Sequence, residues 1–320
     1  MNVDSNFTLL LSGTPIENKV EDLYNILQIV DPVFGKIYNT LSRITKDQNI
    51  LAIETRKIID GIYLSRMKTK KELPVKLNIE EVFIDMNKSE TLVHKKIIQH
   101  FGNDKIKTNA KKDLQYYNDY IIALMRLRQT ASYCYQLKGL DFLKNIKIEK
   151  ESSKEKKLLE LTKTSKEKWI IFTQFNATLN RLKTILPNSV SISGTTPNSQ
   201  RGEIIEKFQN DNTKFIIVSL KAGNSGITLH SANNIIMYDL WWNPAIMQQA
   251  IARAYRIGQT KDVKCYMFAN KKSIDENILK IVNIKKEIID GFNKTNTNNT
   301  TLESKENNTN VINELINKVF

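Results

Sequence analysis

Apolar and polar residues alternate along the second half of the chain in blocks whose period changes. Short apolar runs bounded by polar segments are typical of buried strands, and apolar residues that recur every three or four positions are typical of amphipathic helices. The strand-like runs cover residues 169–172, 190–192, 215–220 and 234–240. The helix-like stretches cover residues 176–186, 200–210 and 245–255. Strands that alternate with helices need crossover connections, so the pattern predicts a parallel sheet covered on both faces.

The first half of the chain has a different pattern. An apolar run at residues 7–11 leads into a turn and an amphipathic stretch at residues 20–30, which predicts strand, turn and helix. From residue 36 to residue 145 the spacing is mainly helical. The break at Leu73-Pro74 is followed by alternation over residues 77–86, which predicts one strand between helical parts.

Two polar segments lie outside these patterns. The charge-dense block at residues 147–168 is expected to form a surface helix and a linker. Residues 293–310 are almost entirely Asn, Thr, Lys, Glu and Ser, so they cannot bury enough apolar surface to offset the entropy of ordering. We expect this tail to be disordered.

Composition narrows the class of partner only in part. The chain has 320 residues, of which 41% are hydrophobic, and this predicts a globular protein. The net charge of +14 favours an anionic partner such as nucleic acid. Frequent lysine, asparagine and isoleucine can equally follow from an AT-rich genome, so motifs must decide the matter.

Cysteine and hydropathy patterns argue against several kinds of site. Cys134 and Cys265 lie far apart without neighbouring ligands at metal-binding spacing, so we expect neither a metal site nor a disulfide. No apolar run has the length of a membrane span, and no secretory signal is visible. The sequence therefore predicts a nuclear or cytoplasmic protein that is not secreted and does not contact a membrane.

Two arginines are candidate catalytic residues. Arg253 and Arg256 are three positions apart near the end of the predicted helix at 245–255, which would place both guanidinium groups on one face. A pair of forked cations suits the charge that a triphosphate develops during phosphoryl transfer. A solvated basic helix end, where arginine also interacts favourably with the helix dipole, is the simpler alternative.

A glycine-containing loop is predicted after the strand at residues 215–220. Gly223 and Gly226 would let backbone amides approach a phosphate closely. Taken alone, the same residues predict an ordinary turn.

The sequence around the two arginines resembles a motif of a known protein family. The run YDLWWNPAIMQQAIARAYRIGQT, from Tyr238 to Thr260, resembles motif VI of SWI/SNF-related superfamily 2 ATPases. Its ending, Ile-Gly-Gln, differs from the Gly-Arg ending of DEAD-box and DEAH-box RNA helicases. The resemblance implies that Arg253 and Arg256 face ATP and that Gln249 lies at a lobe interface. Ala252 and Tyr255 replace the Asp and His of many relatives.

Three further segments resemble motifs of the same family in its second ATPase lobe. VSLKAGNSGITLHSA, at residues 218–232, resembles motif V, which links nucleotide to DNA, and Asn224 and Thr228 depart from its usual Gly and Asn. WIIFTQF, at residues 169–175, resembles motif IV, and the segment from Ser193 to Thr196 resembles the family's Gly-x-Thr segment. These resemblances imply two sets of functional residues. The set at the nucleotide is Gly223 and Gly226, and the set at the DNA backbone is Gln174, Gly194, Thr195, Ser219 and Lys221.

The first half of the chain resembles other parts of the family. LSGTPIEN, at residues 11–18, resembles motif III of the first lobe, with Glu17 in place of Gln. That likeness implies a role for Ser12, Gly13 and Thr14 in coupling the nucleotide state to lobe closure. YLSRMKTKKELPVK and LMRLRQ, which begin at Tyr63 and Leu124, resemble the helical insertions typical of remodelling translocases.

The fold that follows is α/β, with a RecA-like parallel-sheet lobe of the helicase C-terminal kind. It is preceded by a mainly helical insertion region and by the end of a first RecA-like lobe. The expected boundaries are 1–35 for the end of the first lobe, 36–149 for the insertion, 150–290 for the RecA-like lobe and 291–320 for the tail.

The sequence contains neither a Gly-x-x-x-x-Gly-Lys-Ser/Thr phosphate loop nor an Asp-Glu pair ahead of motif III. We therefore expect ATP and Mg²⁺ to bind only in combination with a complementary first lobe, and not to this chain alone. The expected partners are double-stranded DNA, a first lobe supplied in trans or upstream in the gene, and nucleosomes or transcription proteins. A non-catalytic DNA-binding module and an inactive gene remnant are the alternatives. The amino-acid sequence of motif VI also resembles that of the global transactivators of insect viruses.

Overall fold

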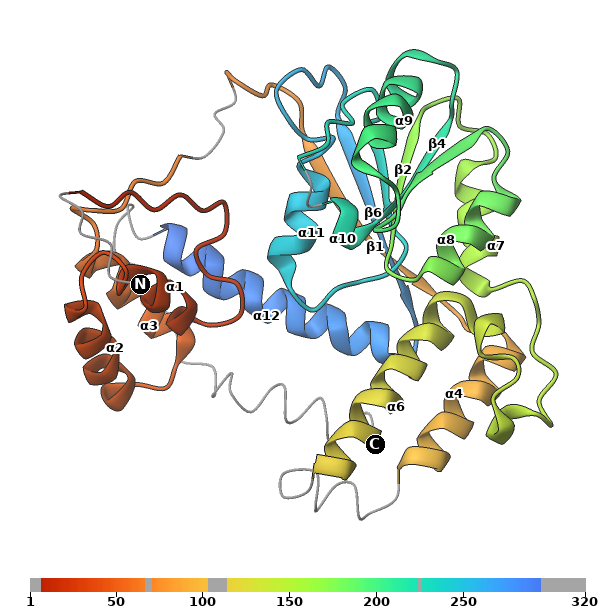
Figure 1. Ribbon diagram of the computed structural model, residues 1–320, viewed down its shortest axis with the longest axis horizontal. Helices are drawn as coiled ribbons and strands as arrows, with labels where there is room; N and C mark the ends of the chain where they lie inside the picture. Colours follow the sequence, from red (N-terminus) through yellow and green to blue (C-terminus); the bar gives the residue numbers. More distant parts are fainter. Residues whose placement is uncertain (1–6, 67–70, 103–113, 224–225, 295–320) are drawn as a thin grey trace. The chain divides into compact units, whose positions relative to one another are not determined.

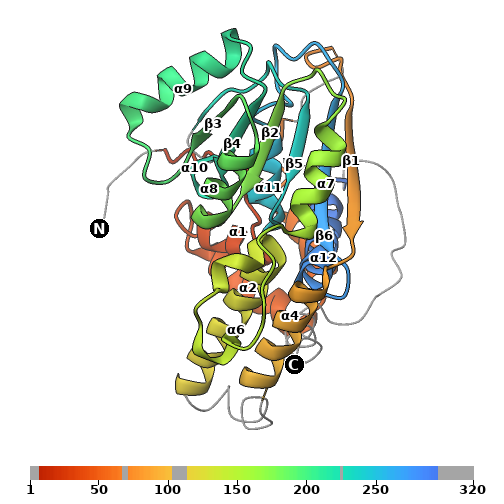
Figure 2. The ribbon, with the colours of Figure 1, turned by 90° about the vertical axis from the view of Figure 1, so that its right-hand side faces the viewer.

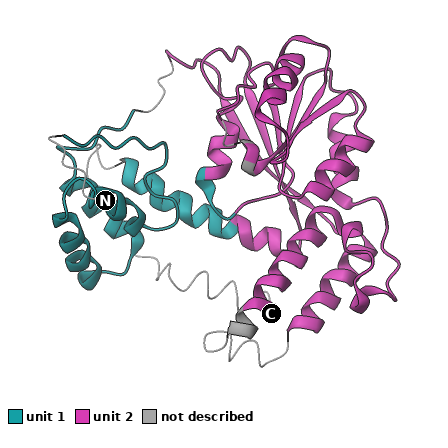
Figure 3. Cartoon of the chain, in the orientation of Figure 1, with its two compact units in different colours: residues 1–67, 242–245, 280–316 teal, residues 68–241, 246–279, 317–320 magenta. Residues whose placement is uncertain are grey.

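The computed structural model describes residues 7–66, 71–102, 114–223 and 226–294. They divide into two compact units, shown in Figure 3. Unit 1 holds the described residues 7–66, 242–245 and 280–294. Unit 2 holds the described residues 71–102, 114–223, 226–241 and 246–279. Each unit is built around its own core and is described by itself.

Unit 2 is organised around a six-stranded sheet, visible in Figure 1. The strands are β1 (Leu77–Ile84), β2 (Trp169–Thr173), β3 (Ser189–Ile192), β4 (Phe215–Ser219), β5 (Asn234–Met237) and β6 (Val263–Asn270). Their order across the sheet is β1-β6-β5-β2-β4-β3, and every neighbouring pair is parallel. Every residue of β2, β4 and β5 is buried, as expected for inner strands of a parallel sheet. The predicted α/β parallel-sheet fold is confirmed.

Helices cover both faces of the sheet (Figures 1 and 2). One face carries α7 (Ser153–Thr162) and α8 (Asn176–Ile185), and the other carries α10 (Leu220–Gly223) and α11 (Pro244–Ile251). The core beneath α7 and α8 includes Leu158 and Leu182 from the helices and Trp169, Phe215 and Ile236 from the strands. Removing such side chains from water is the main favourable term in holding helices to a sheet.

Three further helices and two short 3-10 turns belong to unit 2. They are α4 (Lys88–Phe101), α6 (Leu114–Tyr133) and α9 (Asn198–Asn210), with two short 3-10 turns at Cys134–Leu137 and Asp141–Leu143. Helices α4 and α6 pack side by side (Figures 1 and 2). A capping box at Asn87 and Glu90 fixes the start of α4, because each side chain accepts a hydrogen bond from the other's backbone amide.

Two strands at one side of the sheet come from distant parts of the sequence. The strand predicted at residues 77–86 is confirmed as β1, and it pairs in parallel with β6 along its whole length. Strand β6 was not predicted from the sequence, although Lys264 is its only charged residue. The segment at 77–84 therefore lies in the same sheet as the motif-bearing strands.

The helix predicted in the charge-dense block at 147–168 is confirmed as α7, but two of its charged residues face the core instead of solvent. Helix α7 buries Lys154 and Glu155 almost completely. Lys154 forms an ion pair of 2.8 Å with Asp275, and Glu155 accepts two hydrogen bonds of 3.0 Å from Arg181. Charged residues enter a core only when they are paired, and these partners lie too far along the chain for periodicity to reveal them.

Unit 1 is helical and contains α1 (Val20–Leu27), α2 (Val33–Ile44) and α3 (Gln48–Ile58). The later residues of α12 (Ile274–Lys294) belong to the same unit, and Ile288 and Phe292 from this helix join its core. The core is completed by Leu23 and Tyr24 of α1 and Leu51 of α3. Helix α12 continues to Lys294, so the disorder predicted from residue 293 was wrong for residues 293 and 294. The rest of the predicted tail, from residue 295, lies outside the described residues.

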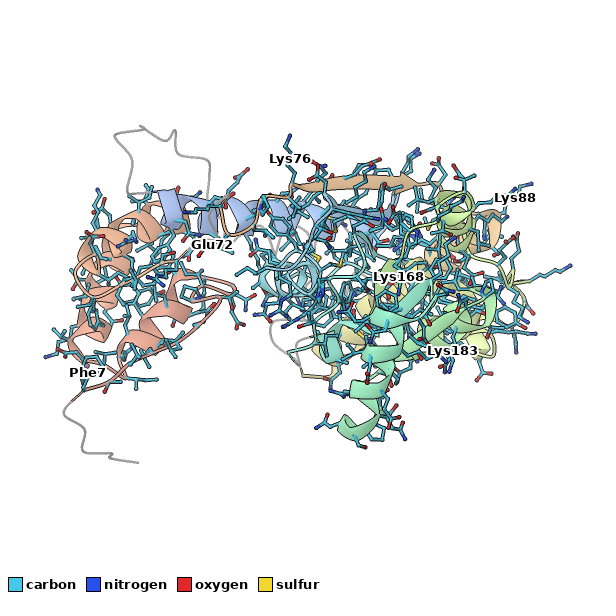
Figure 4. The ribbon with its side chains drawn as sticks, turned by 90° about the horizontal axis from the view of Figure 1, so that it is seen from above. Phe7, Glu72, Lys76, Lys88, Lys168 and Lys183 are labelled. Carbon is cyan, nitrogen blue, oxygen red and sulfur yellow. The ribbon has the colours of Figure 1, made fainter. Side chains whose placement is uncertain are left out.

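The strand predicted at residues 7–11 is not formed. Phe7, Leu9 and Leu11 are exposed by 80%, 68% and 86%, and Figure 4 places Phe7 at the periphery of its unit. A strand needs a neighbouring strand to receive its backbone hydrogen bonds, and the six described strands pair only with one another. The apolar run was read correctly from the sequence, but no described strand pairs with it.

Candidate functional site

The two candidate catalytic arginines lie beyond the helix on which they were predicted. Helix α11 ends at Ile251, and Arg253 and Arg256 occupy the turns that follow. The reason is visible in the hydrogen bonds, since the Arg253 carbonyl accepts from the amide of Leu229, 2.9 Å away, instead of continuing a helix. The helical geometry predicted for the pair was therefore wrong.

The arginines nevertheless line one pocket. It has a volume of about 220 Å³, and its walls are Ala252, Arg253, Arg256 and Ile257. Burial, and then the charge of Arg256, lower the pKa of Arg253. Two neighbouring cations in a partly desolvated pocket favour an anionic ligand, and guanidinium groups match the oxygens of a phosphate.

Thr228 holds one of the two arginines. Its Oγ1 accepts a hydrogen bond of 2.6 Å from Nη1 of Arg256. Thr228 departs from the Asn that is usual in motif V, and the structure places it beside the arginine. Of the two motif VI departures, Ala252 lines the same pocket, and the Tyr255 hydroxyl donates to the Val75 carbonyl at 3.4 Å.

Two glutamines fix the loop that carries Thr228. Gln259 donates to the carbonyls of His230 and Ala232 at 3.0 and 2.9 Å. Gln209, from α9, donates to the Thr228 carbonyl at 3.3 Å and accepts from the Ser231 amide at 3.0 Å. The last residue of the Ile-Gly-Gln ending thus joins the motif VI turns to the motif V loop.

Replacing Gln259 by alanine should lower the free energy of unfolding of unit 2 by about 1–3 kcal/mol, because the buried carbonyl of Ala232 would lose its donor. Urea denaturation followed by circular dichroism measures this loss. The matched control is Gln248→Ala, since Gln248 is exposed on α11 and its loss should change stability by less than about 0.5 kcal/mol. Equal stabilities of the two variants would contradict the role given to Gln259.

The remaining motif V residues lie at the end of β4. Ser219 is the last residue of the strand and is buried. Gly223 ends the short helix α10 where a loop was predicted, and the Lys221 side chain lies outside what the structure describes. Gly226 has a φ of +52°, in the left-handed region that glycine adopts without strain.

A second group of predicted residues gathers at the carboxyl ends of the strands. Gln174 follows β2, the segment 193–196 follows β3, and Ser219 ends β4. Because β2, β4 and β3 are consecutive and parallel in the sheet, these three strand ends lie along one edge. The sequence predicted a DNA-facing role for each segment separately, and the topology brings the segments to a common edge.

The segment at 193–196 is a compact turn. Thr196 Oγ1 accepts from the Ser193 amide at 2.9 Å, and Arg201 donates through Nε to the Thr196 carbonyl at 3.0 Å. Gly194 and Thr195 are exposed at its tip. The amides of Thr195 and Thr196 are bonded within the turn, and the Thr195 hydroxyl is 2.8 Å from Ser193 Oγ. The exposed tip offers its backbone and the Thr195 hydroxyl as groups suited to phosphate oxygens, without base specificity.

Asp239 is a site residue that sequence reasoning quoted but did not assign. Its Oδ2 accepts from the Thr173 hydroxyl at 2.5 Å and from the Gln174 amide at 2.8 Å. The carboxylate therefore fixes the chain where β2 ends. The signal was present in the sequence, since a buried aspartate directly after an apolar strand is uncommon without such partners.

The predicted coupling residues of motif III lie in unit 1. Ser12 and Gly13 are exposed, and the Thr14 amide donates to the Ser12 hydroxyl at 3.1 Å. Further along the motif, Asn18 accepts from Lys285 of α12 at 2.8 Å, and the same ammonium donates to the Trp242 carbonyl at 3.1 Å. Motif III is thus tied within unit 1 to the Trp-Asn-Pro segment at the start of α11.

Several other expectations concern single residues. Gln249 lies half-buried on α11. Both cysteines are buried and free, and burial raises the pKa of each thiol to about 12, so neither is a reactive thiolate. Within the described residues, no group of three or more acidic, histidine or cysteine side chains could hold a metal ion. None of the described helices combines the length and apolar character needed to cross a bilayer.

The parallel sheet, its covering helices and the motifs at its strand ends define a RecA-like lobe of the helicase kind. Residues 153–258 match the helicase conserved C-terminal domain, and residues 1–136 match the SNF2-related domain. The chain belongs to the SWI/SNF-related family of superfamily 2 helicase-like ATPases.

Known relatives support this membership. The chain is 31% identical over 296 residues to an uncharacterized ATP-dependent helicase of Mycoplasma genitalium, covering 90% of the chain and 28% of that relative. It is 29% identical over 299 residues to a human SWI/SNF-related, matrix-associated, actin-dependent regulator of chromatin, covering 87% of the chain and 28% of the relative. The chain thus spans 28% of the length of both proteins.

A solved structure supports the same fold. The SWI2/SNF2 ATPase core of Sulfolobus solfataricus, in complex with double-stranded DNA, is similar with a TM-score of 0.55 and 26% identity. The match covers 90% of this chain and 64% of that one. These relatives are bacterial, human and archaeal, so the resemblance to viral transactivators receives no support from them.

Proposed function

We propose that this chain supplies the second lobe of a DNA-dependent ATPase that translocates along duplex DNA. The observation that carries the proposal is the pocket lined by Arg253 and Arg256, held by the motif V loop on a RecA-like lobe. A first lobe, from the rest of a longer protein or from a separate polypeptide, would supply the phosphate loop that the sequence lacks.

The arginine pocket has the chemistry needed for a nucleotide phosphate. Bound Mg·ATP would supply the phosphoryl group and the charge that the arginines stabilise. Arg256 would donate to phosphate oxygens, and its hydrogen bond to Thr228 Oγ1 keeps its guanidinium within the pocket. Arg253, whose charged form is disfavoured by burial and by Arg256, gains stability when an anion enters.

The strand-end residues would contact the DNA backbone. Gln174, Gly194, Thr195, Ser219 and Lys221 follow three neighbouring strands, and they offer amide, hydroxyl and ammonium donors suited to phosphates. The similar Sulfolobus core was solved with double-stranded DNA, which supports duplex DNA as the ligand. Contacts of this kind position a protein on DNA without reading its sequence.

The surface of unit 1 supports a covering first lobe. More than half of the large apolar side chains that the described residues expose belong to this smaller unit. They are Phe7, Leu9, Leu11, Ile29, Val30, Val33, Ile44, Ile50, Ile58, Ile62 and Leu64. A first lobe that covered these side chains would remove their apolar surface from water. We assign residues 1–35, with Ser12, Gly13 and Thr14, to the end of the first lobe.

The other boundaries follow the motifs. Residues 36–149 would form the family's insertion, 150–290 the second lobe and 291–320 a tail, although β1 of the insertion pairs within the sheet of unit 2. The human relative is named a regulator of chromatin. By that likeness, nucleosomes or transcription proteins are the DNA-bound partners that translocation would displace.

DNA affinity of the whole chain should fall steeply with salt. If the net charge of +14 and the strand-end donors hold the phosphate backbone, binding should weaken about tenfold or more between about 50 and 200 mM salt. Fluorescence anisotropy of labelled duplexes measures this. Unrelated sequences should bind equally well, and a flat salt response would contradict backbone binding.

A further inference from the structure

Arg128 is a buried arginine that the nucleotide pocket does not use. It lies on α6, only 4% exposed, where the helix approaches the carboxyl end of β2 (Figure 1). Its Nη2 donates to the Leu240 carbonyl at 3.1 Å and to the side-chain oxygen of Gln174. The guanidinium also lies 4.8 Å from the ring centre of Trp241 and 5.8 Å from that of Phe175.

Gln174 is therefore held from two directions. Asp239 accepts from its backbone amide, and Arg128 donates to its side chain. These holders come from different elements, since Asp239 follows β5 and Arg128 lies on α6. The half-buried Gln174 side chain has little freedom left, so its orientation is built into the fold.

The chemistry of arginine decides which end of the Gln174 amide faces inward. A guanidinium has donors only, so the carbonyl oxygen of Gln174 must face Arg128. The amide nitrogen then points away, and it makes no hydrogen bond to the described residues. This nitrogen is a donor at the strand edge that also carries the exposed Thr195.

We propose that Arg128 is a positioning residue that orients the Gln174 amide so that its NH₂ group donates to a phosphate oxygen of duplex DNA. The proposal rests on the proposed function, in which this edge of the sheet binds the DNA backbone. In this role, the Leu-Arg-Gln segment of α6 holds the DNA-contacting side chain of Gln174 in place through Arg128.

The charge of Arg128 persists under physiological conditions. Burial lowers the pKa of its guanidinium to about 10, while the carboxylates of Asp239 and Asp275 act to raise it. A pKa near 10 leaves the group protonated at neutral pH, so it keeps its donors. The carboxylate of Asp239 and the two aromatic rings offset part of the cost of burying the cation.

A double-mutant cycle on the whole chain tests this role, with duplex DNA binding measured by anisotropy. Arg128→Met and Gln174→Ala should each weaken binding about five- to tenfold, the effect of losing one hydrogen bond to a charged acceptor. The double variant should bind as weakly as Gln174→Ala alone, because the two residues act through one contact. Gln174→Glu should bind at least as weakly, since it keeps an acceptor for Arg128 but loses the donor.

A matched control separates positioning from general destabilisation. Arg181 is also poorly exposed in unit 2, pairs with Glu155 and touches neither Gln174 nor Asp239. Arg181→Met should reduce thermal stability without weakening DNA binding. If Arg128→Met does not fold, Arg128→Lys and Gln174→Glu decide the matter, and wild-type affinity in both would overturn the proposal.

The binding measurements distinguish failure of the Arg128 role from failure of the proposed function. Wild-type affinity in folded Arg128→Met, or an equal further loss when it is added to Gln174→Ala, overturns the positioning role while leaving the proposed function intact. Failure of the unaltered chain to bind duplex DNA overturns the proposed function, and with it the role of Arg128.

Discussion

Replacing Arg256 by alanine is expected to lower DNA-stimulated ATP hydrolysis about a thousandfold once the chain is combined with a first lobe. An arginine that stabilises the charge of a transferring phosphoryl group typically contributes a factor of this size. Arg256 is suited to the role because its guanidinium lines the pocket and donates to Thr228. DNA affinity should stay nearly unchanged, since the DNA-facing residues follow other strands.

The measurement is steady-state hydrolysis with saturating duplex DNA. Arg256→Lys keeps the charge but loses the forked donors, so it should recover only a small part of the activity. Arg43→Ala is the control, because Arg43 is an exposed arginine of α2 outside every motif. Full turnover in Arg256→Ala would contradict the assignment of this arginine.

Replacing Asp275 by alanine should reduce the free energy of unfolding of unit 2 by about 3–5 kcal/mol, because it leaves the buried Lys154 ammonium without its counter-charge. The side chains of Lys154 and Asp275 are exposed by only 1% and 6%, and their charged atoms are 2.8 Å apart. Asp275 also accepts from the Asn270 amide at 3.1 Å, so the end of β6 loses an anchor. Urea denaturation measures the loss.

Two further variants separate charge from packing. Adding Lys154→Met to Asp275→Ala should restore part of the stability, since no unpaired buried charge remains. Glu160→Ala, which breaks the exposed ion pair with Lys157, should cost less than about 1 kcal/mol. A loss of that small size in Asp275→Ala would mean that the buried pair is unimportant.

Much of the α/β lobe could be predicted from local patterns. The runs at 169–172 and 215–220 correspond to β2 and β4, because strands buried on both faces are apolar throughout. The strand at 77–86 was also predicted, but its partner was not. Which strand lies beside β1 depends on long-range packing, and periodicity carries no information on that.

The candidate site, too, could be predicted from the sequence only in part. Motif spacing predicted that Arg253 and Arg256 would converge, and they line one pocket. Their predicted place on a helix was wrong, because a hydrogen bond from the Leu229 amide ends the helical pattern. The contacts of Thr228 and Arg128 join residues far apart in the sequence, so only the fold could reveal them.

The central claim is that this chain provides one side of an ATPase site whose other side lies in a first lobe. The most direct test measures ATP hydrolysis by the chain alone and by the chain fused to, or mixed with, a lobe that carries a phosphate loop, each with and without duplex DNA. We predict no hydrolysis by the chain alone and DNA-stimulated hydrolysis by the pair, which Arg253→Ala and Arg256→Ala strongly reduce. Hydrolysis by the chain alone, or by the pair regardless of both arginines, would contradict the claim.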